Sequence, residues 1–418
     1  MEEKDLKYKM KVWTKKHKKK APFHSMVLAA LLAVPFFGHQ WIDKPDMPQE
    51  TRPDDVDFRI SMVGDMMLGR HVRDAAVRSG EPVGRVFDYV TPYFKESDYV
   101  TGNFENPVID ADNPEVEAVM EDFELRNKDI HLYADKGAEE ALVDAGFDSV
   151  NLANNHMMDY GNLSLEETLK HMEDVDLDLL GIGRALDPAE GMFEEEETLT
   201  DAGEIHYFDA NGRNIAILGF TDVFVQGYSA SEYVGGVLTN AGLGVLQSRI
   251  REAKEQADIV MVHTHWGDEY QVGSNDTQET LAYLMTDMGA DVIIGHHSHV
   301  LEPITRVHIE RDPDDPQSED KTSIVMNSLG NFVFDQGWSR TKDSTLAQLD
   351  FLQGGGAELS FIPMQISDTR PRETDGILKP FRDYRIFRTL RKELDDQLWR
   401  MEDGRLVIDL KKAGVIEG

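Results

Sequence analysis

Short apolar runs that stop at a glycine or a polar residue recur along the chain after residue 57. Their length and β-branched composition are typical of buried strands. These runs are Phe58–Val63, Ser149–Leu152, Asn214–Phe220, Asp258–Thr264, Val292–Ile294, Ser323–Met326 and Glu358–Ile366. Apolar residues at helical spacing lie between them, in Gly137–Ala145, Leu163–Met172, Gly244–Ala257 and Thr277–Met288. Because strands and helices alternate, the pattern predicts an α/β layered domain.

The N-terminal part of the chain has a different pattern. Residues 1–20 hold nine lysines and three acidic residues, and the apolar run Met26–Phe37 follows. This run is shorter than the ~20 residues of a membrane-spanning helix, and Phe23–Ile42 reaches that length only by including two histidines and a glutamine. We expect an uncleaved signal anchor over residues 21–42, because lysine-rich flanks stay in the cytoplasm. A cleaved signal peptide and a buried soluble helix are the alternatives.

The remaining boundaries follow from composition. Residues 43–57 contain three prolines among acidic residues, which predicts a linker. The domain is expected over residues 58–366, outside the cell, on a chain that crosses the cell membrane once. Residues 367–418 are expected to form a C-terminal tail with one amphipathic helix around Leu390–Met401.

Charge and cysteine content exclude several classes of protein. The net charge is -35, and residues 21–418 alone hold 34 Lys+Arg against 75 Asp+Glu, a net of -41. Such a body should repel nucleic acid and anionic lipid. It is interpreted first as a solvated acidic surface, with a salty environment or cation binding as alternatives. The absence of cysteine excludes disulfides, zinc-thiolate sites and thiol catalysis.

Polar residues stand repeatedly at the carboxyl ends of the predicted strands, where ligand sites of α/β sheets are built. Five segments share this feature. They are Gly64-Asp65, Gly102-Asn103-Phe104-Glu105, Ala153-Asn154-Asn155-His156, His263-Thr264-His265-Trp266-Gly267 and Gly295-His296-His297-Ser298-His299. Each segment alone is weak evidence, since an Asp after a strand is often a helix cap. Together they predict one shared site, and Asp, Glu, Asn and His are ligands that suit Mn, Fe or Zn.

Six motifs in this order resemble those of the CapA/PgsA family of capsule (poly-γ-glutamate) biosynthesis proteins. The likeness covers about Phe58 to Ile366. The matching motifs are Gly64-Asp65-Met66-Met67-Leu68, Gly102-Asn103-Phe104-Glu105, Asn151-Leu152-Ala153-Asn154-Asn155-His156, His265-Trp266-Gly267-Asp268-Glu269-Tyr270, Gly295-His296-His297-Ser298-His299-Val300 and Ser328-Leu329-Gly330-Asn331-Phe332-Val333-Phe334-Asp335-Gln336.

The resemblance implies a calcineurin-like metallophosphoesterase sandwich, with two mixed β-sheets flanked by helices. It implies one or two divalent ions (Mn, Fe or Zn) and His156 as the catalytic histidine. The implied metal ligands are Asp65, Glu105, Asn155, His265, His297 and His299. Further residues implied to support the ligands or to contact substrate are Asn103, Asn154, Arg70 and Asp335.

Three positions depart from the pattern of the phosphoesterases. Met67 stands where a histidine is usual, and Asn103 stands where they carry an aspartate, so Glu105 would have to bridge two ions. These changes leave one ion short of ligands, which keeps a single-metal site or an inactive site open. Ser298 replaces a proline that is usual in the family.

The resemblance implies a membrane-anchored component of polyglutamate capsule synthesis or export. Its partners would be membrane subunits of a polyglutamate synthase complex and an anionic polymer as substrate or product, with no nucleic acid. One alternative is a secreted metal-dependent hydrolase of phosphoester or peptide-like bonds in the envelope. Another is a non-catalytic assembly scaffold. Fold analogy does not decide among them.

Overall fold

The computed structural model describes residues 2–42, 47–48, 52–124, 130–184, 201–231, 235–311 and 319–416. The chain divides into two compact units, Met1–Met47 and Pro48–Gly418. Of the linker predicted over residues 43–57, residues 43–46 and 49–51 lie outside the described residues, and Val56 and Asp57 belong to the first strand of the second unit. The first unit consists of helices α1 (Glu2–His17) and α2 (Ala21–Ile42). No helix within the described residues combines the length and the apolar character needed to cross a membrane.

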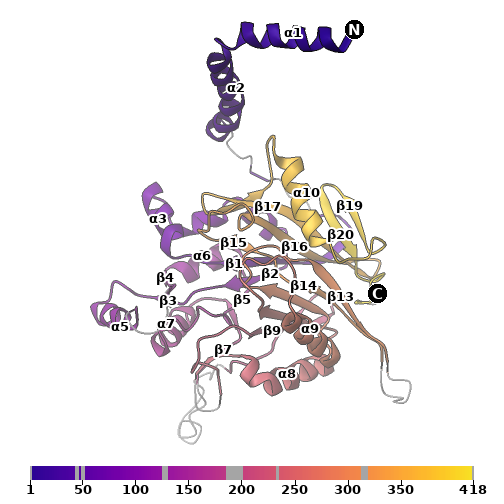
Figure 1. Cartoon of the computed structure of the whole chain (residues 1–418). Helices are drawn as coiled ribbons and strands as arrows, with labels where there is room; N and C mark the ends of the chain where they lie inside the picture. The colour runs from indigo at the N-terminus through magenta and orange to yellow at the C-terminus, as the bar shows by residue number, and fades with distance from the viewer. Residues whose placement is uncertain are drawn as a thin grey trace, which may run out of the picture. The chain divides into compact units, whose positions relative to one another are not determined.

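The second unit contains a ten-stranded mixed sheet (Figure 1). Strands β1, β2, β5 and β6 run parallel, and the antiparallel strands β16, β17, β20 and β19 continue the sheet from β1. Strand β15 adds to β1 and β18 adds to β17. The bounds are β1 (Val56–Met66), β2 (Tyr99–Phe104), β5 (Ser149–Asn151), β6 (Asp178–Leu180), β15 (Asn331–Val333), β16 (Asp343–Leu352), β17 (Ala357–Ser367), β18 (Arg370–Glu373), β19 (Trp399–Glu402) and β20 (Arg405–Asp409).

A second mixed sheet has six strands in the order β13-β14-β12-β11-β9-β8. Its four inner strands are parallel and its two edge strands are antiparallel. The bounds are β8 (His206–Asp209), β9 (Asn214–Thr221), β11 (Ile259–His265), β12 (Val292–His296), β13 (Ile304–Ile309) and β14 (Lys321–Met326). Two small pairs complete the strands, β3 (Val108–Ile109) with β4 (Ala134–Asp135) and β7 (Ile182–Gly183) with β10 (Gly236–Val237).

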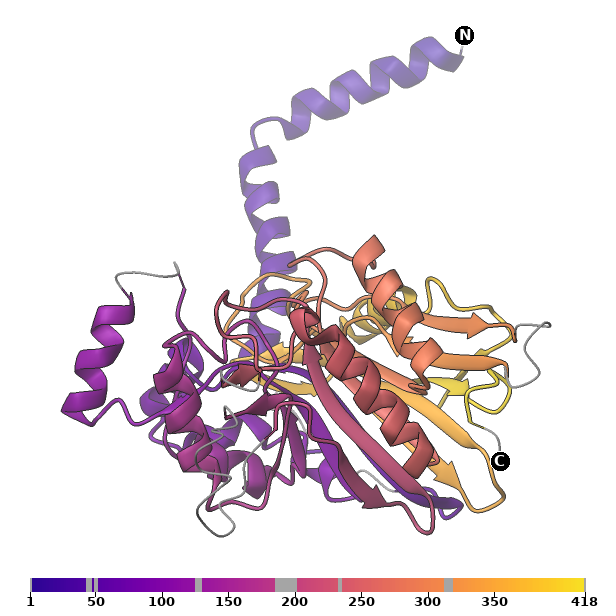
Figure 2. The same cartoon turned by 90° about the horizontal axis from the view of Figure 1, so that it is seen from below.

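Helices cover the outer face of each sheet. On the six-stranded sheet, α8 (Leu243–Gln256) and α9 (Asp276–Met288) lie side by side (Figure 2). The helices on the side of the ten-stranded sheet are α3 (Arg70–Ser79), η1 (Val83–Phe87), α4 (Thr91–Phe94), α5 (Pro114–Glu124), α6 (Ala138–Ala145) and α7 (Asn162–Met172). The short helix η3 (Asn240–Gly242) precedes α8, and α10 (Lys379–Leu390) packs on β16 and β17.

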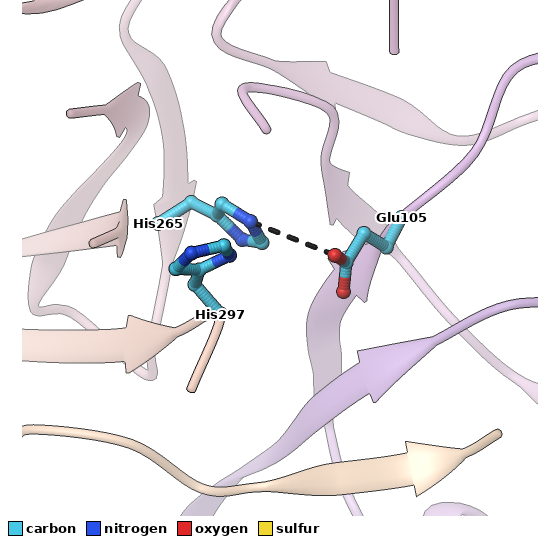
Figure 3. Close-up of side chains that lie close together, drawn as sticks. All are labelled: Glu105, His265 and His297. Atoms are coloured by element: carbon cyan, nitrogen blue, oxygen red, sulfur yellow. Dashed lines mark ion pairs between the residues drawn. The ribbon is translucent and has the colours of Figure 1, made fainter. Parts of the chain in front are cut away.

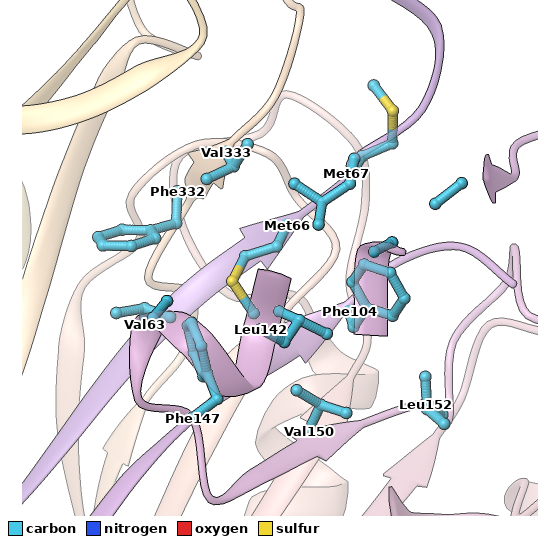
Figure 4. Close-up of a cluster of buried hydrophobic side chains, with 14 of the residues drawn as sticks. Val63, Met66, Met67, Phe104, Leu142, Phe147, Val150, Leu152, Phe332 and Val333 are labelled. Carbon is cyan, nitrogen blue, oxygen red and sulfur yellow. The ribbon is translucent and has the colours of Figure 1, made fainter. Parts of the chain in front are cut away.

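Alternation along β1 explains the layers. Ile60 and Met62 face the core between the two sheets, where they join Met261 of β11. Val63 and Met66 belong to the other core, between the ten-stranded sheet and its helices (Figure 4). Both faces of β1 are buried, and its apolar residues are interrupted by the buried polar side chains of Arg59 and Ser61. The result is a mixed α/β fold with two sheets between helices.

Each strand and helix expected from the apolar pattern between residues 58 and 366 is present, with ends shifted by at most three residues. The helix expected around Leu390–Met401 is wrong. The helix of this region is α10, which begins at Lys379 and ends at Leu390. Trp399–Glu402 instead forms strand β19, because it pairs with β20. Pairing with a neighbouring strand overrides the helical spacing of the apolar residues in that segment. Residues 370–409 thus extend the ten-stranded sheet.

Candidate metal centre

The carboxyl ends of parallel strands from both sheets meet at one place. Asp65 lies near the end of β1 and Glu105 directly follows β2. From the six-stranded sheet, His265 ends β11, and His297 and His299 follow β12. Figure 3 shows the His265 and His297 rings side by side and facing Glu105. All five side chains are buried, at 5% exposure or less.

Close backbone contacts hold these strand ends in place. A Cβ on Gly64 would stand 1.9 Å from the Gly330 carbonyl oxygen, and one on Gly295 would stand 2.0 Å from that of Asn327. Only glycine permits either approach. The loop after β12 is strained, since His297 and His299 have φ angles of 90° and 58°. Strain of this kind persists only where the surroundings hold the backbone, and it is typical of functional sites.

The buried donors form two groups that share one carboxylate. Glu105, His265 and His297 each offer one ligand atom within 4.8 Å of the others, and so do Asp65, Glu105 and His299. The Glu105 Oε1 atom lies 3.7 Å from His265 Nε2 and 3.8 Å from His299 Nε2. Oxygen and imidazole donors, with one shared carboxylate, suit divalent ions of the Mn, Fe and Zn type. The cluster is compatible with a divalent metal, and Glu105 is the residue placed to bridge.

Asn103 supports the site and belongs to neither group. Its Nδ2 donates to Asp65 Oδ1 at 2.8 Å, and its Oδ1 accepts from Asn151 Nδ2 at 2.9 Å. The backbone N–H of His297 donates to the other Asp65 oxygen at 3.2 Å. These bonds fix the Asp65 carboxylate before any ion binds.

The three side chains of the Asn154-Asn155-His156 segment make different contacts. Asn154 holds the turn, because its Oδ1 accepts from the His156 and Met157 N–H groups and its Nδ2 donates to the Phe104 carbonyl. Asn155 Oδ1 lies 2.9 Å from His265 Nε2, beside the first ligand group. His156 Nδ1 lies 2.7 Å from Asp159 Oδ2, a contact that fixes its ring.

The buried histidines of the site differ in their pKa values because their neighbours differ in charge. Burial lowers the pKa of His299, but the Glu105 charge and a hydrogen bond to Asp65 outweigh it and raise the pKa to about 9. Burial, followed by the charges of His297 and other nearby histidines, holds the pKa of His265 well below its ordinary value. The raised pKa favours the protonated form of His299, whose charge balances the nearby carboxylates, and a bound cation would displace that proton.

Two histidines that were not singled out as site residues connect Asp65 to the core. His263 Nε2 lies 2.9 Å from Thr101 Oγ1, and His263 Nδ1 lies 2.8 Å from His296 Nε2. His296 Nδ1 then lies 3.5 Å from Asp65 Oδ1. The signal was present in the sequence, because His263 stands two residues before His265 and shares its face of the strand.

Arg70, Asp335 and Tyr270 lie at the rim of the site. Arg70 Nη2 is 3.1 Å from Asp335 Oδ2, so these two pair with each other. Tyr270 accepts a hydrogen bond from Gln336 and its ring centroid lies 6.0 Å from that of His299. Trp266 is fully buried and donates to the Asn327 carbonyl, which makes it a core residue.

Known proteins resemble the chain over most of its length. The model of the family described as "Bacterial capsule synthesis protein PGA_cap" matches residues 59–336. "Capsule biosynthesis protein CapA" of Bacillus anthracis is 38% identical over 416 residues, which are 98% of this chain and 92% of the relative. "PGA biosynthesis protein CapA" of Bacillus subtilis (strain 168) is 37% identical over 398 residues, 95% and 94% of the two chains.

Solved structures are more distant. A putative 5'-nucleotidase from Staphylococcus aureus aligns with a TM-score of 0.38 at 14% identity, over 79% of this chain and 58% of its own. SoxB from Thermus thermophilus gives a TM-score of 0.34 at 14% identity, over 78% and again 58%. The family is shown by the family model and the two sequence relatives. The chain belongs to the bacterial capsule synthesis protein family PGA_cap.

Proposed function

We propose that this chain takes part in the synthesis or export of a poly-γ-glutamate capsule through a metal centre of the calcineurin-like type. The observation that carries the proposal is the position of Glu105, which is shared by both buried ligand groups. Membership of the capsule synthesis family and the names of the two relatives support the polymer as substrate or product.

Each buried donor has a role in the proposed centre. Asp65, Glu105 and His299 would hold one ion, and His265 and His297 would hold a second together with Glu105. Asn155, beside His265, would complete the second set. When bound, such ions polarise a substrate oxygen and neutralise developing negative charge.

His156 is the general acid or base of this proposal. Its Nδ1 is held by Asp159, so a proton moves to or from substrate through Nε2. Asp159 is buried and also accepts from the Leu132 N–H, which keeps the His156 ring in one orientation. The side chains thus supply a positioned proton carrier beside the candidate ions.

The test compares Glu105→Gln with Glu302→Gln, a matched change at a buried glutamate outside both ligand groups. Metal content of the purified full chains is measured by elemental mass spectrometry, and each variant is returned to a strain that lacks the gene. We expect Glu105→Gln to lose bound metal and surface polyglutamate, while Glu302→Gln keeps both. Full capsule with Glu105→Gln would contradict a metal centre and favour an assembly scaffold.

We also propose that residues 21–42 hold the chain at the cell membrane as a single anchor, with the second unit outside the cell. The nine lysines of residues 1–20 and the apolar run Met26–Phe37 support this topology. External protease on intact protoplasts should digest the second unit and leave an N-terminal tag inside. Protection of the whole chain would refute the topology. Membrane subunits of a polymer synthase are then the expected partners.

A further inference from the structure

Helix α10 differs in charge from the rest of the acidic body. Residues 379–392 hold six Lys or Arg and one Asp, while residues 21–418 as a whole have a net charge of -41. Several of these cations are used inside the unit. Arg385 pairs with Asp343, Lys379 with Glu373 at 3.1 Å, and Arg391 lies over the Trp399 ring. Arg388 makes no ion pair with the residues that the structure describes, and it is exposed.

The same helix has apolar side chains on both of its faces. Its inner face is ordinary core, because Ile386, Phe387 and Leu390 are buried against the sheet. Its outer face carries Phe381 and Tyr384, which are 60% and 57% exposed.

The exposed side chains form one surface. Phe381, Tyr384 and Arg388 are spaced by three and four residues, which places them along one side of α10. Ile377, which is 80% exposed, stands in the turn just before the helix begins. Lys392 lies in the turn that follows α10, is exposed, and pairs with the adjacent Glu393 at 3.3 Å. We call these five residues the α10 face. Large apolar side chains interleaved with cations are the composition of helices that lie at a lipid interface.

The α10 face continues toward the candidate metal centre. Arg385 lies over the Phe381 ring at 5.5 Å and donates to the Ser339 carbonyl at 3.2 Å. The neighbouring Trp338 is 64% exposed and its ring centroid is 4.9 Å from that of Tyr270, the residue beside His299. Exposed aromatic residues therefore extend from α10 to the rim of the site.

We propose that the α10 face is a docking surface for an anionic lipid bilayer. Phe381, Tyr384 and Ile377 enter the headgroup region, and Arg388 and Lys392 pair with lipid phosphates. Charge complementarity favours this occupant, since cations concentrated on an acidic body select a negative surface. Apolar side chains at this exposure favour lipid over a soluble polyanion, which offers few apolar groups to bury them. Docking would hold the rim of the candidate metal centre next to the bilayer.

The test uses the absence of cysteine in the chain. Full-length Tyr384→Cys is labelled with an environment-sensitive fluorophore and reconstituted with vesicles of phosphatidylglycerol and phosphatidylcholine, or of phosphatidylcholine alone. Tyr283→Cys is the matched control, because Tyr283 is 51% exposed on α9. Since the readout is local, binding of the N-terminal lysines to the same vesicles does not affect it. If the 384 label perturbs folding, Ile377→Cys reports on the same face.

On anionic vesicles, we expect the fluorescence emission of the label at 384 to shift to shorter wavelength. Its quenching by aqueous iodide should fall about threefold, as for a group that enters the interface. The label at 283 should not change, and Arg388→Glu in the labelled chain should abolish the effect. Equal quenching on anionic vesicles, neutral vesicles and detergent would overturn the proposal. Protection of both labels, or protection at 384 by polyglutamate without vesicles, would overturn it too.

Discussion

Glu302 gives a prediction whose size can be worked out from the structure. The residue follows the His299 loop, is 1% exposed, and its Oε2 accepts from Gln278 Nε2 at 2.9 Å. Burial raises its pKa from 4.5 to about 7, although the Gln278 amide and the Ser298 hydroxyl oppose the rise. The folded state therefore favours the protonated, neutral side chain.

The sign follows from proton linkage. Between the unfolded pKa of 4.5 and the folded pKa of about 7, the folded chain binds a proton that the unfolded chain has released. The free energy of unfolding must fall as pH rises through this window. At 1.36 kcal/mol for each pKa unit, the loss reaches about 3 kcal/mol above pH 7. Glutamine keeps the shape of the side chain and cannot ionise, so Glu302→Gln removes the loss.

The assay is urea unfolding of wild type and Glu302→Gln at acid and alkaline pH. The variant should be more stable by up to about 3 kcal/mol near pH 8 and equal to wild type near pH 4. Glu279→Gln is the control, because Glu279 is exposed on α9, the helix that carries Gln278. A stability difference that is the same at both pH values, or a variant that is weaker at pH 8, would refute the reasoning.

Two further changes test the buried polar contacts. Asp350→Ala leaves Arg59, which is fully buried and paired with Asp350 at 2.6 Å, without its carboxylate. We expect a loss of about 3–5 kcal/mol in urea unfolding, and a loss below 1 kcal/mol would contradict it. His296→Phe removes the ring nitrogen 3.5 Å from Asp65 and should weaken metal affinity by about 10–100-fold, measured by competition with a chromogenic chelator. Unchanged affinity would show that His296 only fills space.

The strand ends could be predicted from the sequence because their signals are local. A short apolar run that stops before Asp65 or His297 marks both a strand and its carboxyl end, and ligand sites of α/β sheets lie at such ends. The sharing of Glu105 between two ligand groups was expected only through the resemblance to a known family. Its geometry depends on how the two sheets pack, which no local pattern encodes.

Other features could not be predicted from the sequence, because they too depend on packing between distant segments. The contact between His263 and Thr101 joins two sheets across 162 residues of sequence. The segment Trp399–Glu402 has helical spacing, but its pairing with β20 decides its structure. The basic outer face of α10 could have been found from charge alone, since cations are concentrated there in a strongly acidic chain.

The origin of the ligands in two different sheets has a consequence for how the protein matures. Asp65 and Glu105 belong to the ten-stranded sheet, and His265 and His297 belong to the other, with up to 232 residues between Asp65 and His297. No complete ligand group exists until both sheets have docked, so an ion would bind only the finished fold. Binding to the folded state alone shifts the folding equilibrium by mass action. The supply of metal during biosynthesis would then set the yield of folded protein as well as its activity.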